Sequence, residues 1–237
     1  MMRIFITTAV LLAATAWPVW ASNSKVLRGR WFTWLGIAAA FGVASVFGKT
    51  GFAILFLAIG LVVWLEGGVL QEEAREISRT KSTVVFGYRY LAAGMSVLLA
   101  LESLVAGPEF MASLVFVIAL FDIGGWVGGQ VLTRYAPLER KLFPTVSPNK
   151  TLGGLVGSIV LGFAANLWFA VLGVGGFGIG AYLVIALGAI AGDWLESWVK
   201  RTVGVKDASD WLPGFGGLMD RVDSLLPMGL VLLLIGF

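Results

Sequence analysis

Acidic and basic residues gather toward the C-terminal end of a chain that otherwise carries few charges. On a helix, Asp193, Glu196 and Lys200 share one face, because the second and third lie three and seven positions after the first. Asp220 and Asp223 are also three positions apart and share a face if the next helix begins just before them. Two helix ends that present carboxylates to each other make a pocket suited to Mg²⁺, in which basic side chains neutralise phosphates. The alternative is a loop of salt-bridged pairs beside a membrane.

A second group of candidate residues combines hydroxyls with a lysine just before a glycine-rich segment. Ser147, Lys150 and Thr151 directly precede Leu152 and two glycines. Backbone amides at a helix N-terminus, together with a lysine, form a site for anions such as nucleotide phosphates. The alternative is that a hydroxyl caps the helix. Asp122 is a third candidate, because a carboxylate in an apolar segment is costly unless it makes an interhelical hydrogen bond or serves a function.

The composition indicates what kind of scaffold positions these residues. The 237 residues are 58% hydrophobic and 13% charged, whereas about a quarter of the residues of an ordinary soluble domain are charged. So few polar residues cannot cover a soluble globule, and the composition predicts an integral membrane protein. The chain has no Cys and no His, which excludes disulfide frameworks, zinc fingers and mechanisms that need an imidazole. The available chemistry is that of carboxylates, Lys, Arg, hydroxyls and a bound metal.

About eight apolar segments predict membrane-spanning helices, since a hydrocarbon core of roughly 30 Å needs about 20 helical residues. The segments are continuously apolar rather than alternating, which favours helices over a barrel. The last segment counts as a span only if its helix begins near Asp220. We therefore expect an all-α, polytopic membrane helix bundle in one domain, 1–237, with N-terminal helices in 1–110 and catalytic helices and loops in 111–237. The predicted spans are residues 4–20, 31–47, 51–65, 83–101, 110–130, 152–171, 176–198 and 224–237.

The distribution of basic residues predicts the orientation of the bundle. Fourteen of the 17 Lys and Arg residues lie in four alternate loops, 21–30, 66–82, 131–151 and 199–223. The positive-inside rule places these loops, and with them the candidate residues, on the cytoplasmic side of the inner or plasma membrane. The first apolar segment also resembles a secretory signal that ends at Ala21. Cleavage there puts the next basic segment outside, against the rule, so we expect the first helix to be retained.

Two further features are expected to serve packing or surface contacts. Glu66–Ser82 has mixed charges, which is typical of an amphipathic surface helix or a helix extension without chemistry of its own. Glycines four residues apart, such as Gly124 with Gly128 and Gly153 with Gly157, let helix backbones approach closely. Tight helix packing is therefore the expected role of most glycines within the spans.

The charged segment after the seventh span resembles the signature of phosphatidate cytidylyltransferases. Upstream, Ser147-Pro148-x-Lys150-Thr151 and Asp122-Ile123-Gly124 also resemble elements of that family, in the same order. The resemblance covers residues 122–223, while the N-terminal third is similar only in being multi-helical. The signature elements are Ser197-x-Val199-Lys200-Arg201, Lys206-Asp207-x-Ser209 and Leu212-Pro213-Gly214-x-Gly216-Gly217-Leu218-x-Asp220-Arg221-Val222-Asp223.

The resemblance implies a membrane nucleotidyltransferase of phospholipid biosynthesis. The family joins CTP to phosphatidic acid and releases CDP-diacylglycerol and pyrophosphate. The implied cofactor is Mg²⁺, and the implied partners are CTP, phosphatidic acid and the lipid bilayer, with no nucleic acid. A homodimer is also possible under this interpretation.

The resemblance, taken with the residue chemistry, assigns roles to twelve residues. Asp193, Asp220 and Asp223 are the expected Mg²⁺ ligands, and Glu196 is expected to support them. The residues assigned a catalytic role are Asp193, Lys200, Arg201, Lys206, Asp220 and Asp223. Those assigned to substrate binding are Ser147, Lys150, Thr151, Asp122 and Arg221.

Two positions depart from the family pattern and keep other functions open. Phe215 stands where relatives usually have His, and Gly153 stands where they usually have an acidic residue. One alternative is a divergent paralogue that has lost catalysis and binds lipid. Another is a CTP-dependent transferase or kinase that acts on a different lipid, and a small transporter or channel is a further one. Labelled CTP separates the enzymes, because a cytidylyltransferase moves the α-phosphate to lipid and a kinase moves the γ-phosphate.

Overall fold

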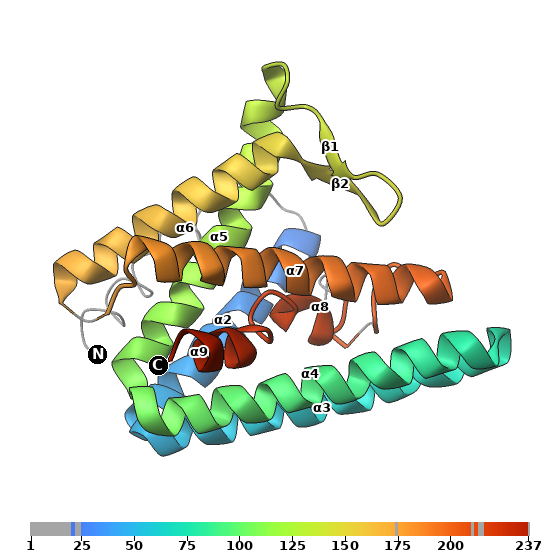
Figure 1. Cartoon of the computed structure of the whole chain (residues 1–237), viewed down its shortest axis with the longest axis horizontal. Coiled ribbons are helices and arrows are strands. Elements are labelled where there is room, and N and C mark those ends of the chain that lie inside the picture. The colour runs from blue at the N-terminus through green and yellow to red at the C-terminus, as the bar shows by residue number, and fades with distance from the viewer. Residues whose placement is uncertain (1–19, 22–24, 174, 210, 213–215, 237) are drawn as a thin grey trace.

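The computed structural model describes residues 20–21, 25–173, 175–209, 211–212 and 216–236, and this part of the chain is mainly helical (Figure 1). Five of its helices are long and apolar enough to cross a membrane. They are α3 (Gly48–Ile77), α4 (Arg79–Ala106), α5 (Pro108–Val131), α6 (Leu152–Leu172) and α7 (Ile179–Val203). The other described elements are α2 (Lys25–Val46), η1 (Leu132–Arg134), β1 (Lys141–Phe143), β2 (Ser147–Thr151), α8 (Met219–Val222) and α9 (Met228–Ile235). The expected class, an all-α membrane protein, is confirmed apart from one small hairpin.

The five long helices match the five predicted spans in the middle of the chain. The predicted spans toward the two ends of the chain do not match in the same way. The predicted span 31–47 falls in α2, of which Trp31–Val46 is the apolar part, and the predicted span 4–20 lies outside the described residues. The last predicted span, 224–237, is not a continuous helix. Its helix α9 has eight residues, or about 12 Å at 1.5 Å per residue. Pro227 stands at its N-cap, where a proline begins a helix and cannot continue the preceding one.

Helices α3 and α4 form a long hairpin and run side by side (Figure 1). Ser78 separates them, and its hydroxyl caps α4 by accepting a hydrogen bond from the Lys81 amide at 3.3 Å. The expected helix extension over Glu66–Ser82 is thus confirmed as the end of α3 and the start of α4. The hairpin lies beside the C-terminal segments of the chain, because α3 contacts α8 and α4 contacts α9.

Glycines bring α5 and α6 into backbone contact, as the spacing predicted. A Cβ atom added at Gly124 or Gly128 would overlap a carbonyl oxygen of α6, and one added at Gly157 would overlap a carbonyl oxygen of α5. A Cβ at Gly153 would lie 3.1 Å from the Gly128 carbonyl oxygen, tighter than ordinary van der Waals contact. A side chain at Gly153 would therefore require its neighbours to shift by a few tenths of an ångström.

A two-stranded hairpin replaces the expected irregular loop over residues 131–151. Strands β1 and β2 pair antiparallel and project from the helices (Figure 1). Thr151 ends β2, and its hydroxyl accepts the Gly154 amide at 3.1 Å, so the predicted helix cap is confirmed there. Arg201 on α7 donates from Nε to the Val146 carbonyl at 3.1 Å and fastens the hairpin to α7.

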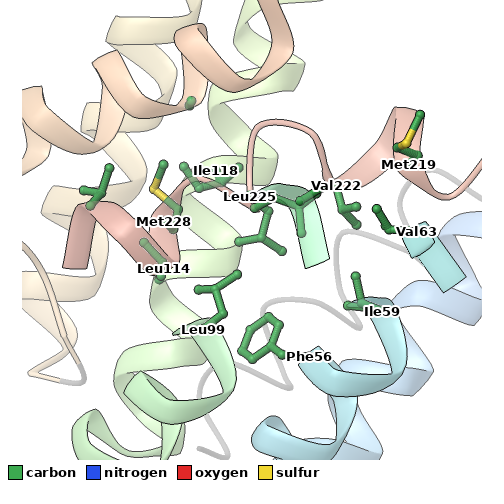
Figure 2. Close-up of a cluster of buried hydrophobic side chains, with 14 of the residues drawn as sticks. Phe56, Ile59, Val63, Leu99, Leu114, Ile118, Met219, Val222, Leu225 and Met228 are labelled. Carbon is green, nitrogen blue, oxygen red and sulfur yellow. The ribbon is translucent and has the colours of Figure 1, made fainter. Parts of the chain in front are cut away.

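The C-terminal segment lies inside the bundle and supplies part of its core. Figure 2 shows side chains from α3, α4 and α5 gathered around those of α8, α9 and the turn between them. This buried path carries Asp220 and Asp223 to the C-terminal half of α7. The labelled members of this core are Phe56, Ile59, Val63, Leu99, Leu114, Ile118, Met219, Val222, Leu225 and Met228.

Candidate active site

One cavity of about 1110 Å³ collects most of the residues that the sequence singled out. Its described lining comes from α2, α3, α5, the hairpin, the start of α6, α7 and residues 207–225. Groups that lie far apart in the sequence therefore face one space. The predicted site residues that line it are Asp122, Ser147, Lys150, Thr151, Asp193, Lys200, Asp220, Arg221 and Asp223.

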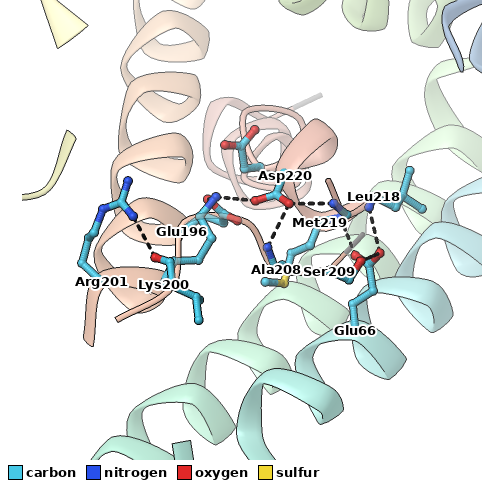
Figure 3. Close-up of polar contacts among 12 residues, drawn as sticks. Glu66, Glu196, Lys200, Arg201, Ala208, Ser209, Leu218, Met219 and Asp220 are labelled. Atoms are coloured by element: carbon cyan, nitrogen blue, oxygen red, sulfur yellow. Dashed lines mark hydrogen bonds and ion pairs between the residues drawn. The ribbon is translucent and has the colours of Figure 1, made fainter. Parts of the chain in front are cut away.

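A buried lysine joins two carboxylates on one side of the cavity (Figure 3). Lys200 Nζ lies 2.6 Å from Glu196 Oε2, one helical turn earlier on α7, and forms a second ion pair with Asp220 Oδ1. Glu196 is fully buried, so Lys200 compensates a charge that solvent does not reach. The predicted shared face of α7 is confirmed for these residues, and Asp220 from α8 completes the group.

The second carboxylate oxygen of Asp220 binds backbone rather than side chains. Oδ2 accepts hydrogen bonds from the Ala208 amide at 3.0 Å and the Gly217 amide at 2.8 Å. Burial raises the pKa of Asp220, but Lys200 and these hydrogen bonds outweigh it and hold the pKa below its usual value. Asp220 thus stays ionised, with Oδ1 paired to Lys200 and Oδ2 organising the segment before it.

A second ion pair links the two groups of candidate residues. Lys150 on β2 pairs with Asp193 Oδ2 on α7, and both side chains are partly exposed. Ser147 and Thr151 belong to the same strand as Lys150 and line the same cavity. Their hydroxyls therefore lie on the same side of the site as Lys150. The hairpin therefore brings the predicted phosphate-binding residues to the acidic face of α7.

Asp122 and Asp223 meet through Ser224. The Ser224 hydroxyl donates to Asp122 Oδ1 at 3.1 Å, and the Ser224 amide donates to Asp223 Oδ1 at 2.8 Å. The expected interhelical hydrogen bond of Asp122 is thus confirmed, and its carboxylate also lines the cavity. Burial, followed by the nearby charges of Asp193, Glu196 and Asp122, raises the pKa of Asp223 well above its usual value.

The charges around the cavity fit a bound cation. Among the described lining residues there are five carboxylates and three basic side chains, so carboxylate groups outnumber basic groups around the cavity. No three acidic side chains in the described part of the chain are grouped closely enough to hold an ion by themselves. Mg²⁺ usually binds one or two carboxylates plus substrate phosphates, so Asp193 and Asp223 suit it by donor type and by charge.

Two predicted residues do not reach the cavity. Arg201 is exposed, and besides its bond to Val146 it donates from Nη1 to the Val205 carbonyl at 2.7 Å. Lys206 is also exposed and does not line the cavity. In this structure Arg201 fastens the hairpin and the end of α7. Phe215, which stands where relatives usually have His, lies outside the described residues.

The structure adds Glu66, which the sequence analysis had assigned to a segment without chemistry. Glu66 is fully buried near the middle of α3. Its carboxylate accepts hydrogen bonds from the Ser209 hydroxyl at 2.8 Å, the Leu218 amide at 2.8 Å and the Met219 amide at 2.7 Å (Figure 3). The sequence feature that could have identified Glu66 is its position directly after an apolar run and before the mixed charges of the segment.

The cavity also has an apolar part, formed mainly by the N-terminal helices. Helices α2, α3 and α5 contribute aliphatic and aromatic side chains together with small residues that leave room. A ligand with a charged head and hydrocarbon tails matches a cavity with one polar and one apolar part. Its apolar lining includes Phe32, Gly36, Ile37, Ala40, Ile59, Val62, Val115 and Ala119.

Comparison with known proteins agrees with this arrangement. The model of the cytidylyltransferase family matches residues 1–237. A phosphatidate cytidylyltransferase of Brucella suis is 30% identical over 259 residues, which cover 87% of each chain. One of Mycobacterium leprae is 32% identical over 224 residues, which cover 85% of this chain and 65% of that protein. One of Mycobacterium tuberculosis is 37% identical over 124 residues, which cover 51% of this chain and 36% of that protein.

Proposed function

The chain belongs to the cytidylyltransferase family, and from this membership we propose that it makes CDP-diacylglycerol and pyrophosphate from CTP and phosphatidic acid. The observation that carries the proposal is the single cavity in which Lys150, Asp193 and Asp223 face the same space as an apolar wall. A nucleotide needs the polar part, and a phospholipid needs both parts. The relatives named phosphatidate cytidylyltransferase support the same substrate pair.

The residues around the cavity divide between the two substrates. Ser147, Lys150 and Thr151 hold the phosphates of CTP, because the hairpin presents a cation and hydroxyl donors together. Lys200 and Arg221 face the lipid phosphate from the opposite side. The hydrocarbon tails of phosphatidic acid lie along α2, α3 and α5, where the lining is apolar.

The chemistry needs alignment and charge neutralisation rather than a proton acceptor. A phosphate oxygen of phosphatidic acid attacks the α-phosphorus of CTP, and the bond to the β-phosphate breaks as pyrophosphate leaves. The attacking phosphomonoester has a second pKa of about 6, so it is largely ionised near neutral pH. A general base is therefore unnecessary, which agrees with a chain that contains no His. Positioned cations stabilise the charge that develops on the phosphates.

Asp193 and Asp223 are the carboxylates that we propose as Mg²⁺ ligands. Asp220 was an equal candidate from the sequence, but its oxygens are engaged with Lys200 and two backbone amides. When bound, Mg²⁺ would neutralise phosphate oxygens and stabilise the leaving pyrophosphate. Asp220 instead holds Lys200 and the preceding segment in place.

We further propose that the cavity opens to the cytoplasm of a cell membrane. The support is the sequence distribution of basic residues, because the loops that contribute to the cavity belong to the basic set. CTP is a soluble cytoplasmic nucleotide, and phosphatidic acid is a membrane lipid, so the two meet at this surface. A homodimer stays a prediction.

The test is CTP-dependent formation of CDP-diacylglycerol by the purified protein in liposomes that contain phosphatidic acid. We expect label from [α-³²P]CTP in the lipid product and none from [γ-³²P]CTP. Asp193→Asn and Asp223→Asn should abolish most of the activity, whereas Glu73→Gln, on the exposed end of α3, should leave it unchanged. Lipid labelled from the γ-phosphate would indicate a kinase, and no transfer by any CTP label would indicate a lipid-binding paralogue.

A further inference from the structure

Glu66 joins the N-terminal half of the bundle to the segment that leads into the site. Residues 207–219 lie between the end of α7 and the first residue of α8 and end just before Asp220, which is followed closely by Asp223. Glu66 reaches this segment from α3 and accepts its hydrogen bonds at both ends, near residue 209 and at residues 218 and 219. A helix that carries no predicted site residue thus determines where the segment lies.

Glu66 and Asp220 share three consecutive backbone amides. The Gly217 amide donates to Asp220, and the Leu218 and Met219 amides donate to Glu66. Within the described residues, the remaining hydrogen bonds of segment 207–219 run inside the segment or to residues 220–222. Among the described residues of this segment, the hydrogen bonds to another long helix are therefore those that Glu66 accepts.

Gly217 shows that the approach of Glu66 is close. A Cβ atom at Gly217 would lie 2.9 Å from Glu66 Oε2 and 2.9 Å from the Ser209 hydroxyl. Real Cβ atoms essentially never show such a distance, so a side chain at this position would push Glu66 or Ser209 aside. A buried carboxylate is costly unless hydrogen bonds satisfy it, and here the segment supplies all three donors.

We propose that Glu66 is a positioning residue for the cytidylyl transfer proposed above, on which this inference rests. It fixes segment 207–219 so that Asp220 meets Lys200 and Asp223 faces the cavity. Glu66 touches neither substrate, and it acts through the segment. Loss of Glu66 therefore misplaces the acidic side of the site while the hairpin with Lys150 keeps its place.

The kinetic test compares Glu66→Gln with Glu102→Gln in the full chain. Glu102 is a matched control, because it is also a buried glutamate, lies on the neighbouring helix α4 and does not line the cavity. In Glu66→Gln, a side-chain NH₂ group replaces one of the two carboxylate oxygens. A donor then faces the backbone N–H groups where an acceptor stood. We expect kcat to fall about 10- to 100-fold, as for partners that orient metal ligands. The KM for CTP should change less than threefold, because Ser147, Lys150 and Thr151 are untouched.

A double-mutant cycle separates positioning from general destabilisation. Ser209→Ala removes one of the three donors and should lower kcat less than Glu66→Gln does. Because both changes act on the same contact, the double variant should be no worse than Glu66→Gln alone. Multiplied effects, or an equal fall of kcat in Glu102→Gln, would contradict the inference.

A spin label reports on the segment without measuring activity. The chain has no Cys, so Trp211→Cys gives one labelling site, at an exposed residue of the segment. We expect the electron paramagnetic resonance spectrum to show faster motion with Glu66→Gln and Glu66→Ala, and no change with Glu102→Gln. An unchanged spectrum in both Glu66 variants would overturn the inference. If the wild-type chain shows no cytidylyl transfer, the proposed function fails, and the spectra alone decide whether Glu66 fixes the segment.

Discussion

Replacing Lys200 with methionine should destabilise the protein more than the loss of any exposed charge. The side chains of Lys200, Glu196 and Asp220 are 10%, 0% and 3% exposed, so water cannot compensate the two carboxylates once the ammonium group is gone. Removing one partner of a buried ion pair typically costs about 3–5 kcal/mol. The backbone amides that donate to Asp220 remain in the variant and limit the stability lost through that carboxylate. Glu196, in contrast, pairs with Lys200 on the same helix. We therefore expect Lys200→Met to lower the free energy of unfolding by about 3–5 kcal/mol.

The assay is unfolding in mixed detergent micelles, followed by the fluorescence of the ten Trp residues. Lys206→Met is the control, since Lys206 is exposed and its replacement should change the free energy by less than about 0.5 kcal/mol. The double variant Lys200→Met/Glu196→Gln should recover at least half of the lost stability, because it removes the carboxylate left without a cation. Its activity should stay low. The reasoning is refuted if Lys200→Met costs less than about 1 kcal/mol, or if the double variant is no more stable than the single one.

Three further predictions test the packing and the two parts of the cavity. Gly128→Ala should lower the free energy of unfolding by about 1–3 kcal/mol, because the new Cβ would overlap the Gly153 carbonyl oxygen of α6. Gly180→Ala is the control and should not lower the free energy of unfolding, because its Cβ would meet nothing within 4 Å. Equal effects of the two variants in the same unfolding assay would contradict the packing argument. Gly36→Phe narrows the apolar part of the cavity, so long acyl chains should fit less well than short ones. The kcat/KM for short-chain phosphatidic acid, divided by that for long-chain phosphatidic acid, should rise about tenfold. An unchanged ratio would show that the hydrocarbon tails do not lie beside Gly36. Lys150→Met should raise the KM for CTP about 10- to 100-fold in the liposome assay, since it removes a charged donor to phosphate. An unchanged KM would show that the hairpin does not bind CTP.

The sequence was informative wherever local spacing decides the geometry. Helical periodicity placed Glu196 and Lys200 on one face, and the helix cap at Thr151 followed from residue type. Glycine spacing predicted the contact between α5 and α6 because backbone approach depends on the missing side chain itself. These features need no knowledge of the rest of the fold.

The remaining features depend on how distant segments meet. An apolar segment that lies among other helices has the same composition as one that faces lipid, so residues 224–237 read as a span although α9 is short. The two backbone amides that Asp220 accepts come from Ala208 and Gly217, and no spacing rule foretells the path between them. Glu66 looked like the first charge of a surface segment, because its three donors lie more than 140 positions away in the sequence.

The two halves of the chain contribute different parts of the proposed reaction. Every predicted site residue lies between Asp122 and Asp223, so the proposed contacts to phosphate and metal come from this part of the chain. The N-terminal helices supply the apolar wall of the cavity and the carboxylate of Glu66. Phosphoryl transfer of this kind requires alignment more than proton transfer, because the nucleophile is already ionised. We therefore expect the N-terminal half, which the family model also matches, to set that alignment, so substitutions there should alter lipid preference and kcat rather than abolish phosphate binding.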